Sequence, residues 1–159
     1  MPASAKIILK PGKEQSILRY HPWIFSGAIQ RIDGSPAEGD TVDVLGSDRQ
    51  FLATGHYQIG SIAVRILSFV PCNIDQQFYD KRIAMALGLR KAIGLADSDS
   101  TNAYRLVHGE GDNLPGLVID FYNGTAVVQM HSVGMFMQRE LIETALKNAY
   151  GTKLKAIYN

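Results

Sequence analysis

The first seventy residues consist of short apolar segments separated by glycine-rich turns, and this pattern constrains the fold more than any other feature of the chain. Strand character is found at residues 5–10, 41–46, 50–55 and 62–69, and a short helical segment is expected at 13–20. Closely spaced short strands are typical of a small barrel or sandwich rather than of a parallel sheet.

The pattern changes at Pro71-Cys72-Asn73. Asp75 is suited to cap a helix that we expect to run to about Ala92. The apolar side chains of this helix share one face, as expected for a helix packed on a core: Tyr79, Ile83, Ala86, Leu87 and Ile93. We therefore predict an α+β chain of two domains, residues 1–72 and 73–159.

The second domain carries a strong hairpin signal at Asn123-Gly124, which lies between two apolar runs. Both positions of such a two-residue turn need a positive φ, which these residue types tolerate. A second amphipathic helix is predicted to end at Gly151, with apolar positions Met135, Leu141, Ile142, Ala145, Leu146 and Ala149. Residues 154–159 begin a further strand, so we expect the polypeptide to continue beyond Asn159.

Composition excludes several classes of protein. The chain has 46% hydrophobic and 19% charged residues, which is typical of a globular protein rather than a disordered one. No apolar run approaches the ~20 residues needed to cross a bilayer. The single cysteine, Cys72, excludes an internal disulfide or a cysteine zinc cluster, and it has no neighbouring base to activate it. We expect a cytoplasmic protein without membrane contact.

Charge is unevenly distributed in the first domain. Residues 1–32 contain Lys6, Lys10, Lys13, Arg19 and Arg31 against a single acid, Glu14. The next stretch is acidic and consists of Asp33, Glu38, Asp40, Asp43 and Asp48. A basic face beside an acidic one can hold a phosphate backbone on one side only. The alternative is that these charges only solvate surface loops.

Aromatic residues accompany the basic residues in the motif at residues 21–29, which contains His21, Trp23 and Phe25. Cations that neutralise phosphates and exposed rings that stack on bases are what single-stranded RNA binding requires. Alternatively, the two larger rings belong to the core of a small β domain. We favour the core interpretation for these rings, and the binding interpretation for the cations and the Ser26-Gly27 backbone.

A second unusual segment lies at residues 108–116, where glycine and proline predict a shaped loop. His108, Glu110 and Asp112 could in principle bind a divalent metal in a small hydrolase, with Asp120 nearby. Their spacing matches no dedicated metal loop, so we favour a structural loop or one that lines a neighbouring domain's site. Pro115 argues against a glycine-rich cofactor cradle, and the residues alone indicate no catalytic centre.

Two separated motifs resemble a known family. Residues 9–29, LKPGKEQSILRYHPWIFSGAI, resemble the opening of bacterial PUA-containing ribosomal RNA methyltransferases, and SIAVRILSF resembles the last strand of their PUA domain. The stretch YRLVHGEGDNLPGLVIDFY is similar to the middle-domain signature R-L-x-x-G-E-x-D-G-L-P-G-L-x-x-D-x-Y. Asn113 replaces a usual glycine but tolerates positive φ. Phe121 replaces a common basic residue, which removes one RNA contact.

The resemblance implies a PUA-like β pseudo-barrel followed by a small α/β middle domain, with the catalytic Rossmann domain absent from this chain. The implied activity is methyl transfer from S-adenosyl-L-methionine (SAM) to C5 of a cytosine through a cysteine adduct, with ribosomal RNA as partner and with a homodimer as one expected state. SAM would serve the full-length parent, whereas this chain alone would bind no cofactor, hold no metal and be inactive. The alternative is a stand-alone, non-catalytic RNA-binding adaptor.

The resemblance also assigns roles to residues of this chain. The residues expected to hold RNA are Lys10, Lys13, Arg19, His21, Trp23, Ser26, Gly27 and Arg105. The loop expected to face the active site contains Gly109, Glu110, Asp112, Leu114 and Pro115.

Overall fold

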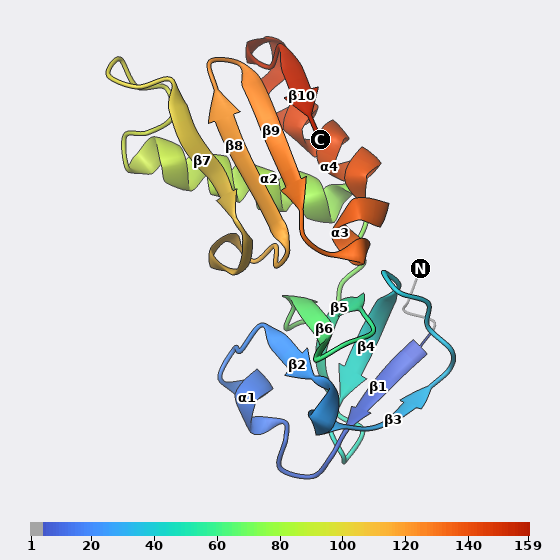
Figure 1. The fold of residues 1–159 in the computed structure, drawn as a ribbon. Helices are drawn as coiled ribbons and strands as arrows, with labels where there is room; N and C mark the ends of the chain where they lie inside the picture. The colour runs from blue at the N-terminus through green and yellow to red at the C-terminus, as the bar shows by residue number, and fades with distance from the viewer. Residues whose placement is uncertain (1–4) are drawn as a thin grey trace. The chain divides into compact units, whose positions relative to one another are not determined.

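The computed structural model describes residues 5–159, so the first four residues of the predicted first domain lie outside the described part (Figure 1). The chain divides into two compact units, which are described separately. The first extends to Asn73 and includes Ser132–Gly134, and the second comprises Ile74–His131 and Met135–Asn159. No sequence pattern indicated that residues 132–134 group with the first unit. The predicted α+β class is confirmed.

The first unit is built on a six-stranded sheet of order β2-β6-β5-β4-β1-β3. The strands β1 and β4 are parallel, whereas the other neighbours are antiparallel. Its elements are β1 (Ala5–Leu9), α1 (Gln15–Leu18), β2 (Trp23–Phe25), η1 (Ser26–Ala28), β3 (Ile29–Asp33), β4 (Thr41–Leu45), β5 (Phe51–Tyr57) and β6 (Ile62–Ser68).

Register shifts curl this sheet around its core. They occur between Ile8 and Leu9, Ile24 and Phe25, Val44 and Leu45, and Thr54 and Gly55. Each shift bends its strand and increases the local twist, so the sheet closes over its apolar face. The enclosed core consists of Ala5, Ile7, Leu9, Ile17, Ile24, Val42, Val44, Ala53, Val64 and Ile66.

One sequence expectation for this unit needs correction, and two strands were missed. The helix expected at residues 13–20 is a single turn, α1, because Tyr20 has a φ of 61° and the chain turns there. The strands β2 and β3 were not predicted from sequence. The first of these is only three residues long, and the second, IQRID, shows little apolar alternation, so their pairing partners rather than local pattern fix them as strands.

The second unit is a four-stranded sheet of order β10-β9-β8-β7, with helices α2 and α4 packed against each other (Figure 1). The strand β10 is parallel to β9, and the other pairs are antiparallel. Its elements are α2 (Gln76–Ala92), β7 (Ala103–His108), η2 (Gly109–Asp112), β8 (Leu117–Tyr122), β9 (Thr125–Met130), α4 (Arg139–Tyr150), η3 (Gly151–Lys153) and β10 (Ala156–Tyr158). A short helix α3 (Val133–Met137) precedes α4.

Local signals of the second unit are confirmed. The Asp75 carboxylate accepts a hydrogen bond from the Phe78 amide and caps α2, which ends at Ala92 as predicted. Asn123 and Gly124 have φ values of 46° and 94° and join β8 to β9 as a two-residue hairpin turn. The expected strand after residue 154 is present as β10. The second amphipathic helix is interrupted at Gln138, so that α3 and α4 replace one continuous helix.

One predicted core residue of α2 is wrong. Ile93 lies beyond the last helical residue and is 59% exposed. Arg90 takes its place on the buried face: its guanidinium donates to both carboxylate oxygens of Asp112 at 2.6 and 2.7 Å and to the Arg105 carbonyl at 2.9 Å. Asp112 also accepts from the His108 amide at 2.6 Å. This buried ion pair ties α2 to β7 and to the loop after it.

Replacing Asp112 by Ala should lower the free energy of unfolding of the second unit by about 3–5 kcal/mol, because Arg90 is left as an uncompensated buried charge. Urea unfolding followed by far-ultraviolet circular dichroism measures the loss. Glu143→Ala is the matched control, since it removes an exposed pair with Lys147 and should cost less than about 0.5 kcal/mol. Equal effects of the two substitutions would contradict the structural role of Asp112.

The first unit contains a buried histidine whose charge state should affect stability. His56 is 2% exposed, and within residues 5–159 neither ring nitrogen has a hydrogen-bond partner. Burial lowers the pKa of His56 to about 4. The unfolded chain therefore binds a proton that the folded chain does not, and stability is lost as pH falls from about 6.5 toward 4.

The pH dependence of urea unfolding, followed through emission of the single tryptophan, Trp23, tests this. The unfolding midpoint should fall between pH 7 and pH 5, and the fall should be smaller in His56→Phe. An unchanged pH dependence in that variant would remove His56 as the cause.

Candidate functional site

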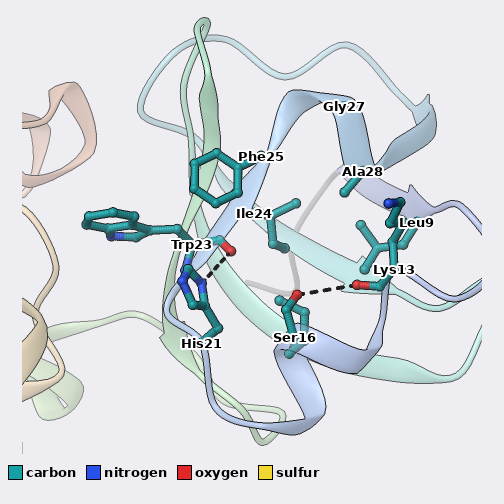
Figure 2. Close-up of a pocket in the computed structure, with 10 residues that line it drawn as sticks. Leu9, Lys13, Ser16, His21, Trp23, Ile24, Phe25, Gly27 and Ala28 are labelled. Carbon is teal, nitrogen blue, oxygen red and sulfur yellow. Dashed lines mark hydrogen bonds between the residues drawn. The ribbon is translucent and has the colours of Figure 1, made fainter.

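The first unit contains a cavity of about 370 Å³ at the place where α1, β2 and η1 meet the end of β1 (Figure 2). Its lining consists of Leu9, Lys13, Ser16, Ile17, His21, Trp23, Ile24, Phe25, Gly27 and Ala28. Figure 2 shows the rings of His21, Trp23 and Phe25 on one side of Ile24 and Lys13 and Ser16 on the other. The cavity therefore combines an aromatic side with a side that carries a cation.

The aromatic side follows from the alternation of side chains along β2. Ile24 points into the core and is 2% exposed, so its two neighbours must point to the opposite face. Trp23 is half-buried, and Phe25 is 48% exposed. The core interpretation that we favoured for Phe25 is thus wrong, because strand alternation places Ile24 in the core in its stead.

The three rings form one cluster at the rim. The centroid of His21 lies 6.0 Å from that of Trp23 and 6.1 Å from that of Phe25, and Trp23 and Phe25 are 6.4 Å apart. The interplanar angles are 81°, 44° and 87°, so the rings meet edge-on or tilted rather than stacked. His21 Nδ1 lies 3.2 Å from the Trp23 amide nitrogen and 3.1 Å from its carbonyl oxygen, which fixes the imidazole beside the strand.

Lys10 organises the opposite wall. Its ammonium donates to the Gly27 carbonyl at 2.8 Å, and its amide donates to the Ala28 carbonyl at 2.9 Å. The Ser26 amide donates to the Ser61 carbonyl at 2.9 Å, so the Ser26-Gly27 turn is held from two sides. Lys10 therefore positions the turn that closes the cavity, and among residues 5–159 its ammonium uses one of its three donors for this bond.

The basic and acidic side chains near the cavity differ in whether they have partners. Among residues 5–159, neither Lys13 nor Arg19 forms an ion pair, and both side chains are exposed. The acidic residues that follow are occupied locally: each accepts a hydrogen bond from a backbone amide, a hydroxyl or an arginine, namely Asp33, Glu38, Asp40, Asp43 and Asp48. The cations thus remain available to an anionic ligand, whereas the carboxylates serve turns and strands.

The structure does not bring all expected RNA-binding residues to the cavity. Lys13, His21, Trp23 and Gly27 line it, and Lys10 contacts it through Gly27. Arg19 caps the end of α1 outside the lining residues. Sequence reasoning did not select six other lining residues, although all lie in the motif at residues 9–29, because the motif does not show which of its side chains share a cavity: Leu9, Ser16, Ile17, Ile24, Phe25 and Ala28.

Arg105 belongs to the second unit, where it pairs with Asp120 across β7 and β8 at 2.9 and 3.1 Å. Its guanidinium also lies 3.3 Å from His108 Nδ1. The pair with Asp120 raises the pKa of Arg105 further above its ordinary range. Any RNA contact of Arg105 would therefore compete with a carboxylate already in place.

The loop at residues 109–116 has a structural explanation in the second unit. Asn113 adopts a φ of 57°, as its tolerance of positive φ predicted, and Leu114 and Pro115 are buried. Gly109 is buried, whereas Glu110 is exposed. Because Asp112 is committed to Arg90, it is not available as the metal ligand or base that the hydrolase alternative requires. Phe121 is also buried and stacks on Tyr150 at 4.5 Å.

A second cavity, of about 290 Å³, lies in the second unit near the hairpin turn, and two of its three charged lining residues, Asp97 and Lys153, are paired with each other. The cations Lys91 and Lys153 both pair with Asp97, at 3.0 and 2.6 Å. These two contacts lower the pKa of Asp97. The Tyr150 hydroxyl is hydrogen-bonded to that of Tyr104 at 2.9 Å, and burial together with this bond raises the pKa of Tyr150. This cavity is a weaker candidate than the one in the first unit.

Within residues 5–159, no helix is both long and apolar enough to cross a membrane.

Comparison with known proteins supplies the family context. A family model described as a PUA-like domain matches residues 7–69, which contain the whole first cavity. Ribosomal RNA large subunit methyltransferase I from Yersinia pseudotuberculosis and from Yersinia pestis are each 41% identical to this chain over 149 residues. These alignments cover 92% of this chain but only 37% of each relative.

Solved structures show the same fold. A candidate SAM-dependent methyltransferase from Streptococcus mutans superposes with a TM-score of 0.80 at 21% identity, over 96% of this chain and 40% of that one. A candidate methyltransferase solved in complex with SAH gives a TM-score of 0.81 at the same identity and coverage. The chain therefore contains a PUA-like domain at residues 7–69 and is homologous to part of ribosomal RNA large subunit methyltransferase I.

Proposed function

We propose that this chain is the RNA-binding part of a SAM-dependent methyltransferase that forms 5-methylcytosine in ribosomal RNA. The observation that carries the proposal is the cavity of the PUA-like domain, where exposed aromatic rings accompany Lys13, which forms no ion pair within residues 5–159. Rings that stack on bases and cations that neutralise phosphates are the two components of single-stranded RNA binding. The names of the curated relatives support ribosomal RNA as the substrate.

Catalysis is assigned to a part of the parent protein that this chain does not include. The chain spans only 37% of the length of the curated relatives, which supports this assignment. The most glycine-rich loop leads through η2 into the strand β8, whereas a phosphate or cofactor cradle needs the N-terminus of a following helix. The proposal places no catalytic residue within residues 5–159.

The second unit would then serve the parent as a middle domain. Its loop around Gly109, Glu110 and Asp112 is the segment we propose to face the catalytic domain, and the Arg90–Asp112 pair would keep that loop in shape. We further propose that the parent is a cytoplasmic protein. The homodimer stays a prediction, and sedimentation velocity checks it.

The competing function is a stand-alone RNA-binding adaptor without catalysis. An assay of the complete gene product distinguishes the two functions. If the product is a methyltransferase, it should transfer a labelled methyl group from SAM to large-subunit ribosomal RNA. Absence of transfer by a complete product that binds this RNA would favour the adaptor.

RNA binding by this chain should depend strongly on salt, because phosphate contacts release counterions. In a titration of an unstructured RNA oligomer against salt, Lys13→Ala should lower the slope of log K against log[salt] by about 1 and weaken binding across sequences. Lys6→Ala is the matched control, since it removes the same charge from an exposed residue of β1 that does not line the cavity. Equal losses in the two variants would move the contact surface away from the cavity.

A further inference from the structure

The floor of the cavity in the PUA-like domain is apolar, although its rim is charged and aromatic. Leu9, Ile17 and Ile24 line it and are at most 2% exposed. A volume of about 370 Å³ falls within the ~300–1,000 Å³ typical of small-ligand sites. A phosphate backbone alone would not be stabilised by such a floor, since its charged oxygens gain no favourable contact from apolar surface. The cavity therefore fits a ligand with one apolar, planar part and one anionic part.

We propose that this cavity receives a single unpaired nucleobase, so that the PUA-like domain selects bulged or single-stranded RNA over continuous duplex. The inference rests on the proposed RNA-binding function and specifies which feature of the RNA the domain reads. A base inside a duplex is stacked on both faces and paired at its edge, and cannot enter a cavity without being extruded. An unpaired base carries little of that cost.

The rim is suited to the flat face of a base. Phe25 is 48% exposed and meets Trp23 at 87° and His21 at 44°, so its face is not covered by stacking on either ring. Aromatic side chains of this kind stack on any base. Two polar groups in the lining could contact the base edge, namely the Ser16 hydroxyl and the imidazole of His21.

The positions of the cations indicate that the phosphates of the nucleotide stay outside the cavity. In Figure 2, Lys13 lies across Ile24 from the three rings. A base held against the rings would direct its phosphates toward the solvent-exposed ammonium groups of Lys10 and Lys13. An apolar peptide would also suit the floor, but it would leave these positive charges without partners. Charge complementarity therefore favours a nucleotide.

Three hairpin RNAs test this proposal with the 159-residue chain; each is closed by a non-nucleotide linker, so that no loop base is unpaired, and they differ at one position of the stem. The first carries one bulged uridine, the second carries an abasic site at the bulge, and the third is a continuous duplex. The abasic hairpin keeps every phosphate and removes only the base. We expect the bulged hairpin to bind about 5- to 150-fold more tightly than the abasic one, the range for one stacked base. Trp23 emission should change with the bulged hairpin and much less with the abasic one.

Phe25→Ala should remove most of this preference, because the ring on which the base would stack is lost. The substitution removes a half-exposed ring, so the domain should still fold, which circular dichroism verifies. Tyr122→Ala is the matched control, because Tyr122 is 51% exposed and belongs to the second unit. The Tyr122→Ala variant should prefer the bulged hairpin as strongly as the unmodified chain does.

The outcomes separate this inference from the proposed function. Equal affinity for all three hairpins, with salt dependence intact, would overturn the base site but leave RNA binding standing. No affinity for any hairpin at low salt would overturn both. Persistence of the full preference in Phe25→Ala would also reject the cavity as the place where the base binds.

Discussion

The alternation of side chains along β2 determines which side chains the first unit exposes around its cavity. A strand of three residues can bury only one side chain or its two neighbours, and here the core takes Ile24. The two flanking rings must then lie on the outer face. The register shift between Ile24 and Phe25 bends the strand at this point and leads it into the turn that Lys10 holds. The aromatic rim, the apolar floor and the closing turn are thus consequences of one packing choice.

Electrostatics then distinguish the basic from the acidic residues of this unit. The acidic residues after β3 are bound to local donors and act as parts of turns and strands, as Asp40 does when it accepts from the Ala37 amide at 2.8 Å. Lys13 and Arg19 have no such partners within residues 5–159. A nearly neutral chain with a net charge of +1 can therefore still present a local positive surface.

Sequence reasoning succeeded where the determining interaction is local. Asp75 caps α2 through an amide three residues away, and Asn123-Gly124 needs only its own backbone preferences to form the hairpin. It failed where the partner is distant. Ile93 suits the helical stripe by spacing, but the buried position belongs to Arg90, whose partner lies 22 residues further along the chain.

The candidate site shows the same division. His21, Trp23 and Lys13 could be selected because aromatic and basic residues in one short motif suggest nucleic-acid binding. These residues share a cavity with Leu9 and Ala28 because of the way the sheet curls. The curl results from register shifts, which the residue pattern does not predict. The exposure of Phe25 likewise depends on which residue of β2 the core accepts.

The Arg90–Asp112 pair has a consequence for how such chains can diverge. The two side chains are only 5–10% exposed, so loss of either partner leaves the charge of the other buried and unpaired. Most single substitutions at these positions are therefore disfavoured. An apolar pair of similar volume would be tolerated, but only if both residues changed together. Among homologous sequences, the positions of Arg90 and Asp112 should therefore be inherited as a unit, and a lineage that has lost one should have lost the other.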